Sequence, residues 1–251
     1  NIDVKKGEIL GLVGESGSGK STLGNAIINL IDEPGRISNG TISLDGINIH
    51  KKPEDKLKYR GKKIGLIFQD PQTSLNPLLT VGEQIIETIQ THLKLNLDES
   101  KNKAINLLKE VGIKDAESRF DNYPHQFSGG MRQRVVISLA LCCEPELLIA
   151  DEPTTALDVS IQSQILELIK TLTKERNLAV ILITHDMGVI SETADRVAVM
   201  KNGHLIEIGS TKEILTNPKE LYTKSLISSV PPTNKKILRF RIIEKEKKKE
   251  G

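Results

Sequence analysis

The chain has 251 residues and a mass of 27.7 kDa, enough for one large domain that buries its own core without disulfides. Its formal net charge of +2 and its four Phe and three Tyr without Trp argue against a nucleic-acid binder built on charge or base stacking. The two cysteines, Cys142 and Cys143, are adjacent in an apolar segment and predict small buried groups in a reducing compartment.

Short apolar runs alternate with segments of helical period, which is typical of an α/β protein with a mostly parallel, buried sheet. The strands are predicted at residues 9–13, 64–68, 147–150, 179–183 and 197–200. Helices are predicted where apolar residues recur at three- and four-residue spacing, at residues 23–30, 104–111 and 161–172. Asp45-Gly46 and Asn202-Gly203 predict hairpin turns, which add antiparallel strands near both ends of the core.

The interval 71–144 has a helical pattern and no convincing strand, so we predict a helical subdomain inserted into an α/β core of residues 1–70 and 145–230. Residues 231–251 predict a basic, partly disordered tail. The longest apolar run, 135–143, is too short to cross a bilayer. Because the sequence opens without Met just before a strand, we expect further residues upstream in the intact protein.

The strongest local signal is the phosphate loop, residues 14–21 (GESGSGKS), which lies between a predicted strand and an amphipathic helix. Its three glycines let backbone amides approach a triphosphate closely, and the helix that follows offers unpaired amides to an anion. We expect Lys20 to reach the β- and γ-phosphates and Ser21 to ligate Mg²⁺. The candidate phosphate-binding residues here are Gly14, Ser16, Gly17, Ser18, Gly19, Lys20, Ser21 and Thr22. Thr22 stands where a dinucleotide fingerprint would need its third glycine, which disfavours that alternative.

A second candidate site is the apolar run 147–150 followed by Asp151 and Glu152. Ligands of open α/β sheets bind at the carboxyl ends of strands, where these two carboxylates are expected. We predict that Asp151 holds Mg²⁺ through its water shell and that Glu152 orients or deprotonates a water attacking the γ-phosphate. The plainer alternative is a pair of solvated carboxylates, which the presence of a phosphate loop in the same chain makes a weaker interpretation.

A third candidate, Ser128-Gly129-Gly130, precedes a helical run and forms a second helix N-terminus suited to an anion. Within one subunit, there is no evident reason for two anion-binding helix N-termini to act on the same γ-phosphate. The two ends make sense where two subunits face each other and each supplies one end to the nucleotide of the other. We therefore expect a dimer with shared sites.

At these residues the sequence resembles the ATP-binding subunits of ABC transporters, and the likeness covers nearly the whole chain. The three segments above carry it, together with Gln69 after a strand, the segment 155–158 and His185. Three further segments are similar to the oligopeptide/dipeptide/nickel importer branch: 68–77, 123–134 and 217–232. No aromatic residue precedes Tyr59, so no residue is assigned to stack on adenine.

The resemblance implies a P-loop ATPase with ATP and Mg²⁺ as cofactors. Its catalytic residues would be Glu152, His185 and Gln69. Gln69 would contact Mg²⁺ or the attacking water, His185 would hydrogen-bond the γ-phosphate, and Asp158 would contact the partner subunit.

The resemblance also implies a place at the cytoplasmic face of the cell membrane, as a peripheral subunit. The partners would be a second ATPase subunit, two membrane-spanning permease subunits and, indirectly, an extracytoplasmic solute-binding protein, with no nucleic acid. The cargo would be peptides or nickel. Two alternatives stay open: a soluble ABC-type ATPase in DNA repair or translation, and a non-enzymatic module that binds ATP and signals.

Overall fold

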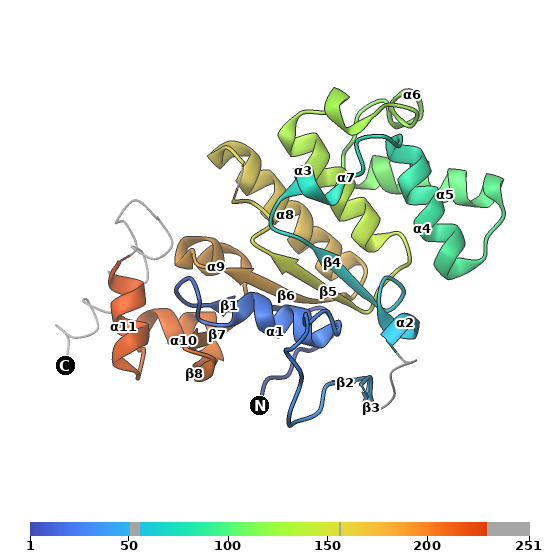
Figure 1. Ribbon diagram of the computed structural model, residues 1–251. Helices are drawn as coiled ribbons and strands as arrows, with labels where there is room; N and C mark the ends of the chain where they lie inside the picture. Colours follow the sequence, from blue (N-terminus) through green and yellow to red (C-terminus); the bar gives the residue numbers. More distant parts are fainter. Residues whose placement is uncertain (51–55, 156, 230–251) are drawn as a thin grey trace. The chain divides into compact units, whose positions relative to one another are not determined.

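The computed structural model describes residues 1–50, 56–155 and 157–229, and the chain divides into two compact units (Figure 1). The first unit joins Asn1–Leu23 to the residues from Lys170 onward, and the second consists of Gly24–Ile169. The predicted tail at 231–251 lies outside the described residues. Among the described residues, no helix combines the length and the apolar character that a membrane span requires.

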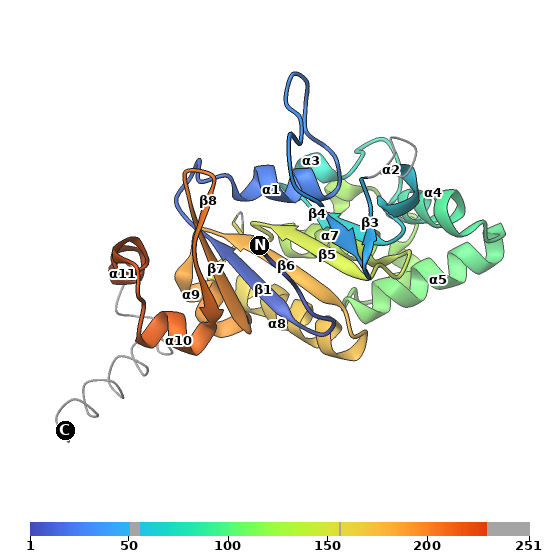
Figure 2. The same cartoon turned by 90° about the horizontal axis from the view of Figure 1, so that it is seen from below.

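The first unit contains four neighbouring strands in the order β6–β1–β7–β8 (Figure 2). Strand β1 (Ile9–Val13) runs parallel to β6 (Ala179–Thr184) and to β7 (Arg196–Lys201), and β8 (His204–Ser210) returns antiparallel to β7. Both β1 and β6 are buried at every position, as expected for strands covered on two faces. The predicted Asn202-Gly203 hairpin is confirmed, with both residues at positive φ.

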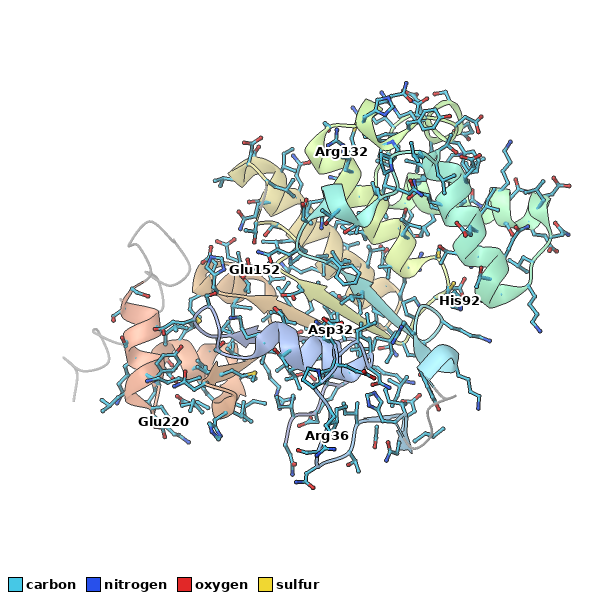
Figure 3. All side chains as sticks on the ribbon, viewed as in Figure 1. Asp32, Arg36, His92, Arg132, Glu152 and Glu220 are labelled. Carbon is cyan, nitrogen blue, oxygen red and sulfur yellow. The ribbon has the colours of Figure 1, made fainter. Side chains whose placement is uncertain are left out.

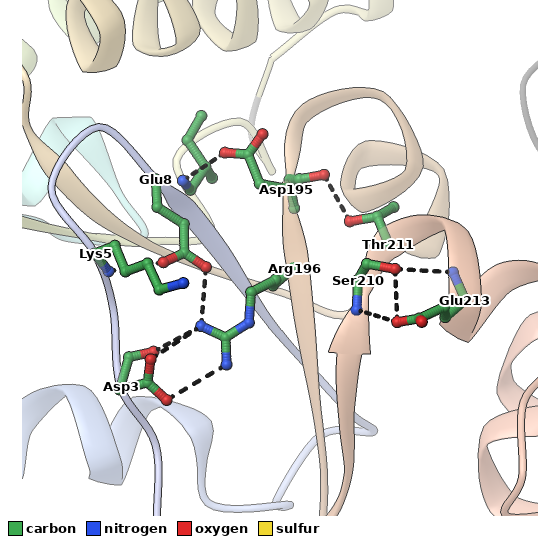
Figure 4. Close-up of polar contacts among 10 residues, drawn as sticks. Asp3, Lys5, Glu8, Asp195, Arg196, Ser210, Thr211 and Glu213 are labelled. Carbon is green, nitrogen blue, oxygen red and sulfur yellow. Dashed lines mark hydrogen bonds and ion pairs between the residues drawn. The ribbon is translucent and has the colours of Figure 1, made fainter.

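Polar contacts tie the start of β1 to the start of β7 (Figure 4). The Arg196 guanidinium donates to carboxylate oxygens of Glu8 at 3.0 Å and Asp3 at 3.2 Å. The Asp195 carboxylate accepts from the amide of Ile9 at 2.9 Å. These contacts stabilise the register of the strand that leads into the phosphate loop.

The described part of the first unit also contains three whole helices, α9 (Met187–Thr193), α10 (Thr211–Thr216) and α11 (Leu221–Ser228). Two further helices are shared along the chain with the second unit: α1 (Lys20–Ile27) contributes its residues up to Leu23, and α8 (Val159–Glu175) contributes those from Lys170 onward. Ser210 caps α10 in a reciprocal pair with Glu213, which is drawn in Figure 4. The first predicted helix begins near Ser21 as expected but ends earlier than residue 30, because Asn29 adopts the left-handed conformation.

The second unit holds two strand pairs. Strand β4 (Ile64–Ile67) runs parallel to β5 (Leu147–Asp151), with Ile67 opposite Ala150. The short strands β2 (Ser43–Leu44) and β3 (Ile47–Asn48) pair antiparallel around the predicted Asp45-Gly46 turn. The predicted α/β fold with mostly parallel strands and antiparallel additions is therefore confirmed.

Between β4 and β5 the regular secondary structure is helical, without a strand, as the sequence predicted for the interval 71–144. The elements are α3 (Pro71–Ser74), α4 (Val81–Leu93), α5 (Leu97–Glu110), α6 (Ala116–Arg119), a 3₁₀ turn η2 (Pro124–Gln126) and α7 (Gly129–Leu141). Helices α4 and α5 lie side by side in both views and each starts with a capping box (Figures 1 and 2). The short α2 (Lys56–Tyr59) precedes β4, and α8 (Val159–Glu175) follows β5. The predicted boundaries between core and helical subdomain stay a prediction.

Candidate functional site

The phosphate loop connects β1 to α1, and its lysine lies inside the loop. The Lys20 ammonium donates to the carbonyl oxygens of Gly14 at 2.8 Å and Glu15 at 2.9 Å and to Ser18 Oγ at 3.2 Å. Its side chain is buried, with the whole residue 6% exposed, so these oxygens replace water around the charge. Ser21 and Thr22 are exposed in the first turn of α1, where the backbone amides of a helix have no partner within the helix.

His185 lies at the same end of the first unit as the phosphate loop. The β1–β6 register pairs Val13 with Thr184, so Gly14 and His185 leave neighbouring strands at the same level. His185 is exposed, and the next residue, Asp186, caps α9 by accepting from the Gly188 amide at 2.6 Å. The strand pairing thus brings two of the predicted groups together within the first unit.

Gln69 and Glu152 meet in the second unit through the same kind of register. Ile67 is paired with Ala150, so the residues two positions further along each strand are also neighbours. Gln69 Nε2 lies 3.5 Å from Glu152 Oε2, a long contact between an exposed and a half-buried residue. Glu152, labelled in Figure 3, has a φ of 47°, a left-handed conformation that is uncommon for a glutamate. Asp151 ends β5 and is half-buried.

Thr155 holds the Glu152 carboxylate, and sequence reasoning missed this role. Its hydroxyl donates to Glu152 Oε2 at 2.6 Å, and its amide donates to the Glu152 carbonyl at 3.3 Å. The signal was the local spacing: a hydroxyl three residues after a carboxylate, across a turn that contains Pro153. The sequence prediction used Thr155 only as part of the segment 155–158.

Ser128 begins α7 as its N-cap and is exposed. Its Oγ accepts from the Met131 amide at 3.4 Å, and Gly129 beside it is also exposed. Gly130 faces α8, because a Cβ there would lie 2.7 Å from Cγ2 of Ile161. The helix end predicted to face an anion is therefore at the surface, next to the start of α8.

Asp158 stands directly before α8, with its side chain exposed. Its carbonyl accepts from the Gln162 amide at 2.8 Å, which is the first turn of that helix. Asp158 lies at the surface near Ser128-Gly129-Gly130, since a Cβ on Gly129 would lie 3.7 Å from the side chain of Leu157, the residue before it.

The donor chemistry at these positions suits Mg²⁺. A serine hydroxyl, an aspartate carboxylate and a glutamine amide (Ser21, Asp151 and Gln69) are all hard oxygen donors, which Mg²⁺ prefers. Within the described residues, no group of three or more His, Cys, Asp or Glu side chains is arranged to hold a metal.

The mostly parallel strands and the phosphate loop between β1 and α1 together define an α/β protein of the phosphate-loop class. A family model described as "ABC transporter" matches residues 1–155, which is more than half of the chain. The chain therefore belongs to the ABC transporter family, in the group of oligopeptide and dipeptide transport ATP-binding proteins.

Two relatives illustrate the likeness in sequence. The chain is 51% identical over 233 residues to the oligopeptide transport ATP-binding protein OppD of Bacillus subtilis, and 50% identical over 232 residues to the dipeptide transport ATP-binding protein DppD of Haemophilus influenzae. These matches cover 92% of this chain, 65% of OppD and 70% of DppD. The chain thus spans about two thirds of the length of these relatives.

Two solved structures are similar in fold. The ATP-binding cassette MJ0796, in a dimeric post-hydrolysis state bound to ADP and Pi, has a TM-score of 0.73 at 31% identity, covering 84% of this chain and 88% of that one. The cbiO1 protein of Clostridium perfringens, part of the ABC transporter complex cbiONQ, has a TM-score of 0.77 at 31% identity, covering 97% and 90%.

Proposed function

We propose that this chain hydrolyses ATP to drive the import of oligopeptides or dipeptides. The observation that carries the proposal is the register of two parallel strand pairs. The register of β1 with β6 places His185 beside the phosphate loop, and that of β4 with β5 places Gln69 beside Glu152. Each strand pair thus brings two such groups together within its own unit. The names of OppD and DppD support peptides as cargo, and nickel gains no support from these relatives.

The phosphate loop would bind the triphosphate. Lys20 already lies among loop oxygens, so its ammonium can turn from them to the β- and γ-phosphates without leaving a buried site. Ser16, Gly17, Ser18 and Gly19 would offer backbone amides, followed by those of Ser21 and Thr22 at the start of α1.

Glu152 would act as the base that orients or deprotonates the attacking water. Thr155 holds one carboxylate oxygen from within the same turn, and Gln69 contacts the same oxygen from the neighbouring strand end. His185 would donate to the γ-phosphate as charge develops on its oxygens.

Ser21, Asp151 and Gln69 would hold Mg²⁺, Asp151 through water. When bound, the ion would neutralise charge on the β- and γ-phosphates. The residues themselves supply hydroxyl, carboxylate and amide oxygens.

A second ATPase subunit would complete each site. Ser128 and Gly129 are exposed at a helix N-terminus that continues in Gly130, and Asp158 is exposed close by, so one subunit can offer these groups to the nucleotide of the other. The dimeric state of the MJ0796 cassette supports this arrangement. Closure of the pair would move two membrane-spanning permease subunits, with the ATPases peripheral at the cytoplasmic face and a solute-binding protein delivering cargo outside.

The deciding experiment measures peptide uptake in cells that lack this protein and carry either the wild type, Glu152→Gln or the matched control Glu175→Gln. Glu175 is an exposed carboxylate at the end of α8, away from the loops described above. We expect uptake with the wild type and with Glu175→Gln and none with Glu152→Gln. Full uptake with Glu152→Gln, or normal uptake in cells without the protein, contradicts the proposal.

A further inference from the structure

The phosphate loop contacts residues of the first unit that come much later in the sequence. The Gly203 amide, in the β7–β8 turn, donates to the Ser18 carbonyl at 2.9 Å. Gly14 packs against the end of β7, since a Cβ there would lie 2.2 Å from the Met200 carbonyl oxygen. The strand and turn that follow β1 in the sheet therefore support one side of the loop.

A second support comes from α11. The Glu15 amide, in the loop itself, donates to the phenolic oxygen of Tyr222 at 3.1 Å, although 207 residues separate them. Tyr222 is half-buried, and the Lys201 ammonium lies 4.6 Å from the centroid of its ring. The ring is thus held by β7, while its hydroxyl reaches the loop.

The sheet also anchors the approach to α11. The carboxylate of Glu207, on β8, accepts from the backbone amides of Lys219 at 2.9 Å and Glu220 at 3.2 Å. These are the residues immediately before the helix, so Glu207 places its first turn. Tyr222 is the second residue of that turn.

We propose that Tyr222 is a positioning residue for the phosphate loop and couples α11 to nucleotide binding. This inference rests on the proposed function, in which the loop binds ATP. The phenolic oxygen restrains the peptide that joins Gly14 to Glu15, where the chain turns out of β1, so the amides further along start closer to their bound arrangement. Because coupling between two binding events is reciprocal, ATP in the loop should in turn strengthen the attachment of α11.

The main test compares Tyr222→Phe with the wild type and with Tyr59→Phe, a tyrosine of α2 in the other unit. Phenylalanine keeps the ring and its contact with Lys201 but loses the hydroxyl. We expect ATP affinity in the presence of Mg²⁺, measured by calorimetry, to fall about 3- to 10-fold, the share of one neutral hydrogen bond. Hydrogen exchange at the Glu15 amide, followed by NMR, should accelerate in Tyr222→Phe and stay unchanged in Tyr59→Phe.

Two further measurements keep the test decisive. Glu207→Gln should loosen α11 and move affinity and Glu15 exchange in the same direction, by a smaller factor. Addition of ATP should slow exchange of the α11 amides in the wild type and leave them unaffected in Tyr222→Phe. This readout measures coupling, which a residue that merely packs would not show.

The outcomes separate the inference from the proposed function. Normal affinity and normal Glu15 exchange in Tyr222→Phe, with ATP binding weakened in Lys20→Ala, overturns the role of Tyr222 and leaves the phosphate loop in place. A fall in affinity without a change in Glu15 exchange also overturns it, because the effect would then not pass through this bond. Unchanged ATP binding in Lys20→Ala overturns the loop assignment itself.

Discussion

The two units hold their candidate site groups in different ways. In the first, the phosphate loop is surrounded: Lys20 and Ser18 are buried, and Tyr222 and Gly203 reach the loop from distant parts of the chain. In the second, Glu152 is half-buried, and its carboxylate contacts Thr155, three positions further on, and Gln69, across a strand pair. Distant contacts thus support the first site, and local ones the second.

This difference matches what each part has to do. A loop that binds a polyanion gains affinity when its amides are fixed beforehand, which buried and distant contacts achieve. A base that activates water needs access to solvent and to a second subunit, which a partly exposed position gives. The comparison therefore predicts that binding and hydrolysis can be broken separately, one in each unit.

The largest expected effect lies in the second unit. Glu152→Gln should bind ATP as the wild type does and lose about 10²–10⁴-fold in turnover, because the amide cannot accept the proton. Single-turnover phosphate release by the purified chain measures the loss, with Glu175→Gln as the matched control. Near-normal turnover would remove Glu152 from the role of base.

The next effect lies in the first unit. Lys20→Ala removes the buried ammonium and should weaken ATP binding about 10- to 100-fold, the contribution of a charged hydrogen-bonding group. Calorimetric titration measures it, beside Lys174→Ala on α8 as a control for net charge. If Lys20→Ala lowered turnover at saturating ATP and left the affinity unchanged, the assignment of binding to the first unit and hydrolysis to the second would be wrong.

A third variant tests the contact between α7 and α8 in the second unit. Gly130→Ala places a methyl group 2.7 Å from Cγ2 of Ile161 and should destabilise that unit by about 1–3 kcal/mol. Urea unfolding measures the loss. In an Ile161→Ala background the same change should cost much less, and equal costs in both backgrounds would contradict the packing argument.

Thr155→Val should have a smaller effect, on turnover alone. Valine keeps the shape of threonine but loses the hydroxyl that donates to Glu152, so the carboxylate samples more orientations. We expect turnover to fall about 3- to 10-fold, ATP affinity to hold, and Thr155→Ser to restore most of the rate. A serine variant as slow as the valine variant would argue for packing rather than for the hydrogen bond.

Local patterns predicted the groups that lie on strand ends. Buried strands and functional loops both have recognisable sequence patterns. An apolar run therefore indicated a strand before each of GESGSGKS, Gln69, Asp151-Glu152 and His185. That groups on neighbouring strands lie close together also follows in part, since parallel strands end at one edge of a sheet. The register that sets Gln69 opposite Glu152 had to come from the structure.

The supports of the phosphate loop were not predictable. Tyr222 lies on a short helix far along the chain, and nothing within its neighbourhood indicates a bond to the Glu15 amide. Likewise, the left-handed backbone of Glu152 is imposed by the turn after β5 rather than by a preference of glutamate. Contacts between distant segments depend on how helices pack, which periodicity does not encode.

The smallest predicted effect is a pH dependence that belongs to the first unit. Burial raises the pKa of Glu207, but hydrogen bonds from the Lys219 and Glu220 amides outweigh it, so the pKa lies below the ordinary value of 4.5. A carboxylate whose pKa is lower in the folded chain adds stability above its unfolded pKa and loses it as the pH falls through the folded one. Protection of the α11 amides should therefore decrease below about pH 4.5.

Glu207→Gln isolates this contribution, because glutamine does not titrate. In that variant the α11 amides should be less protected at neutral pH and should respond less to acid. Helix α4 provides the comparison in the second unit: hydrogen bonds with Thr80 lower the pKa of its capping Glu83 as well, so its amides should respond to acid equally in both proteins. If α11 kept its full acid response in Glu207→Gln, another group would anchor the helix. Glu207 would then not be the residue that links β8, through α11, to the phosphate loop.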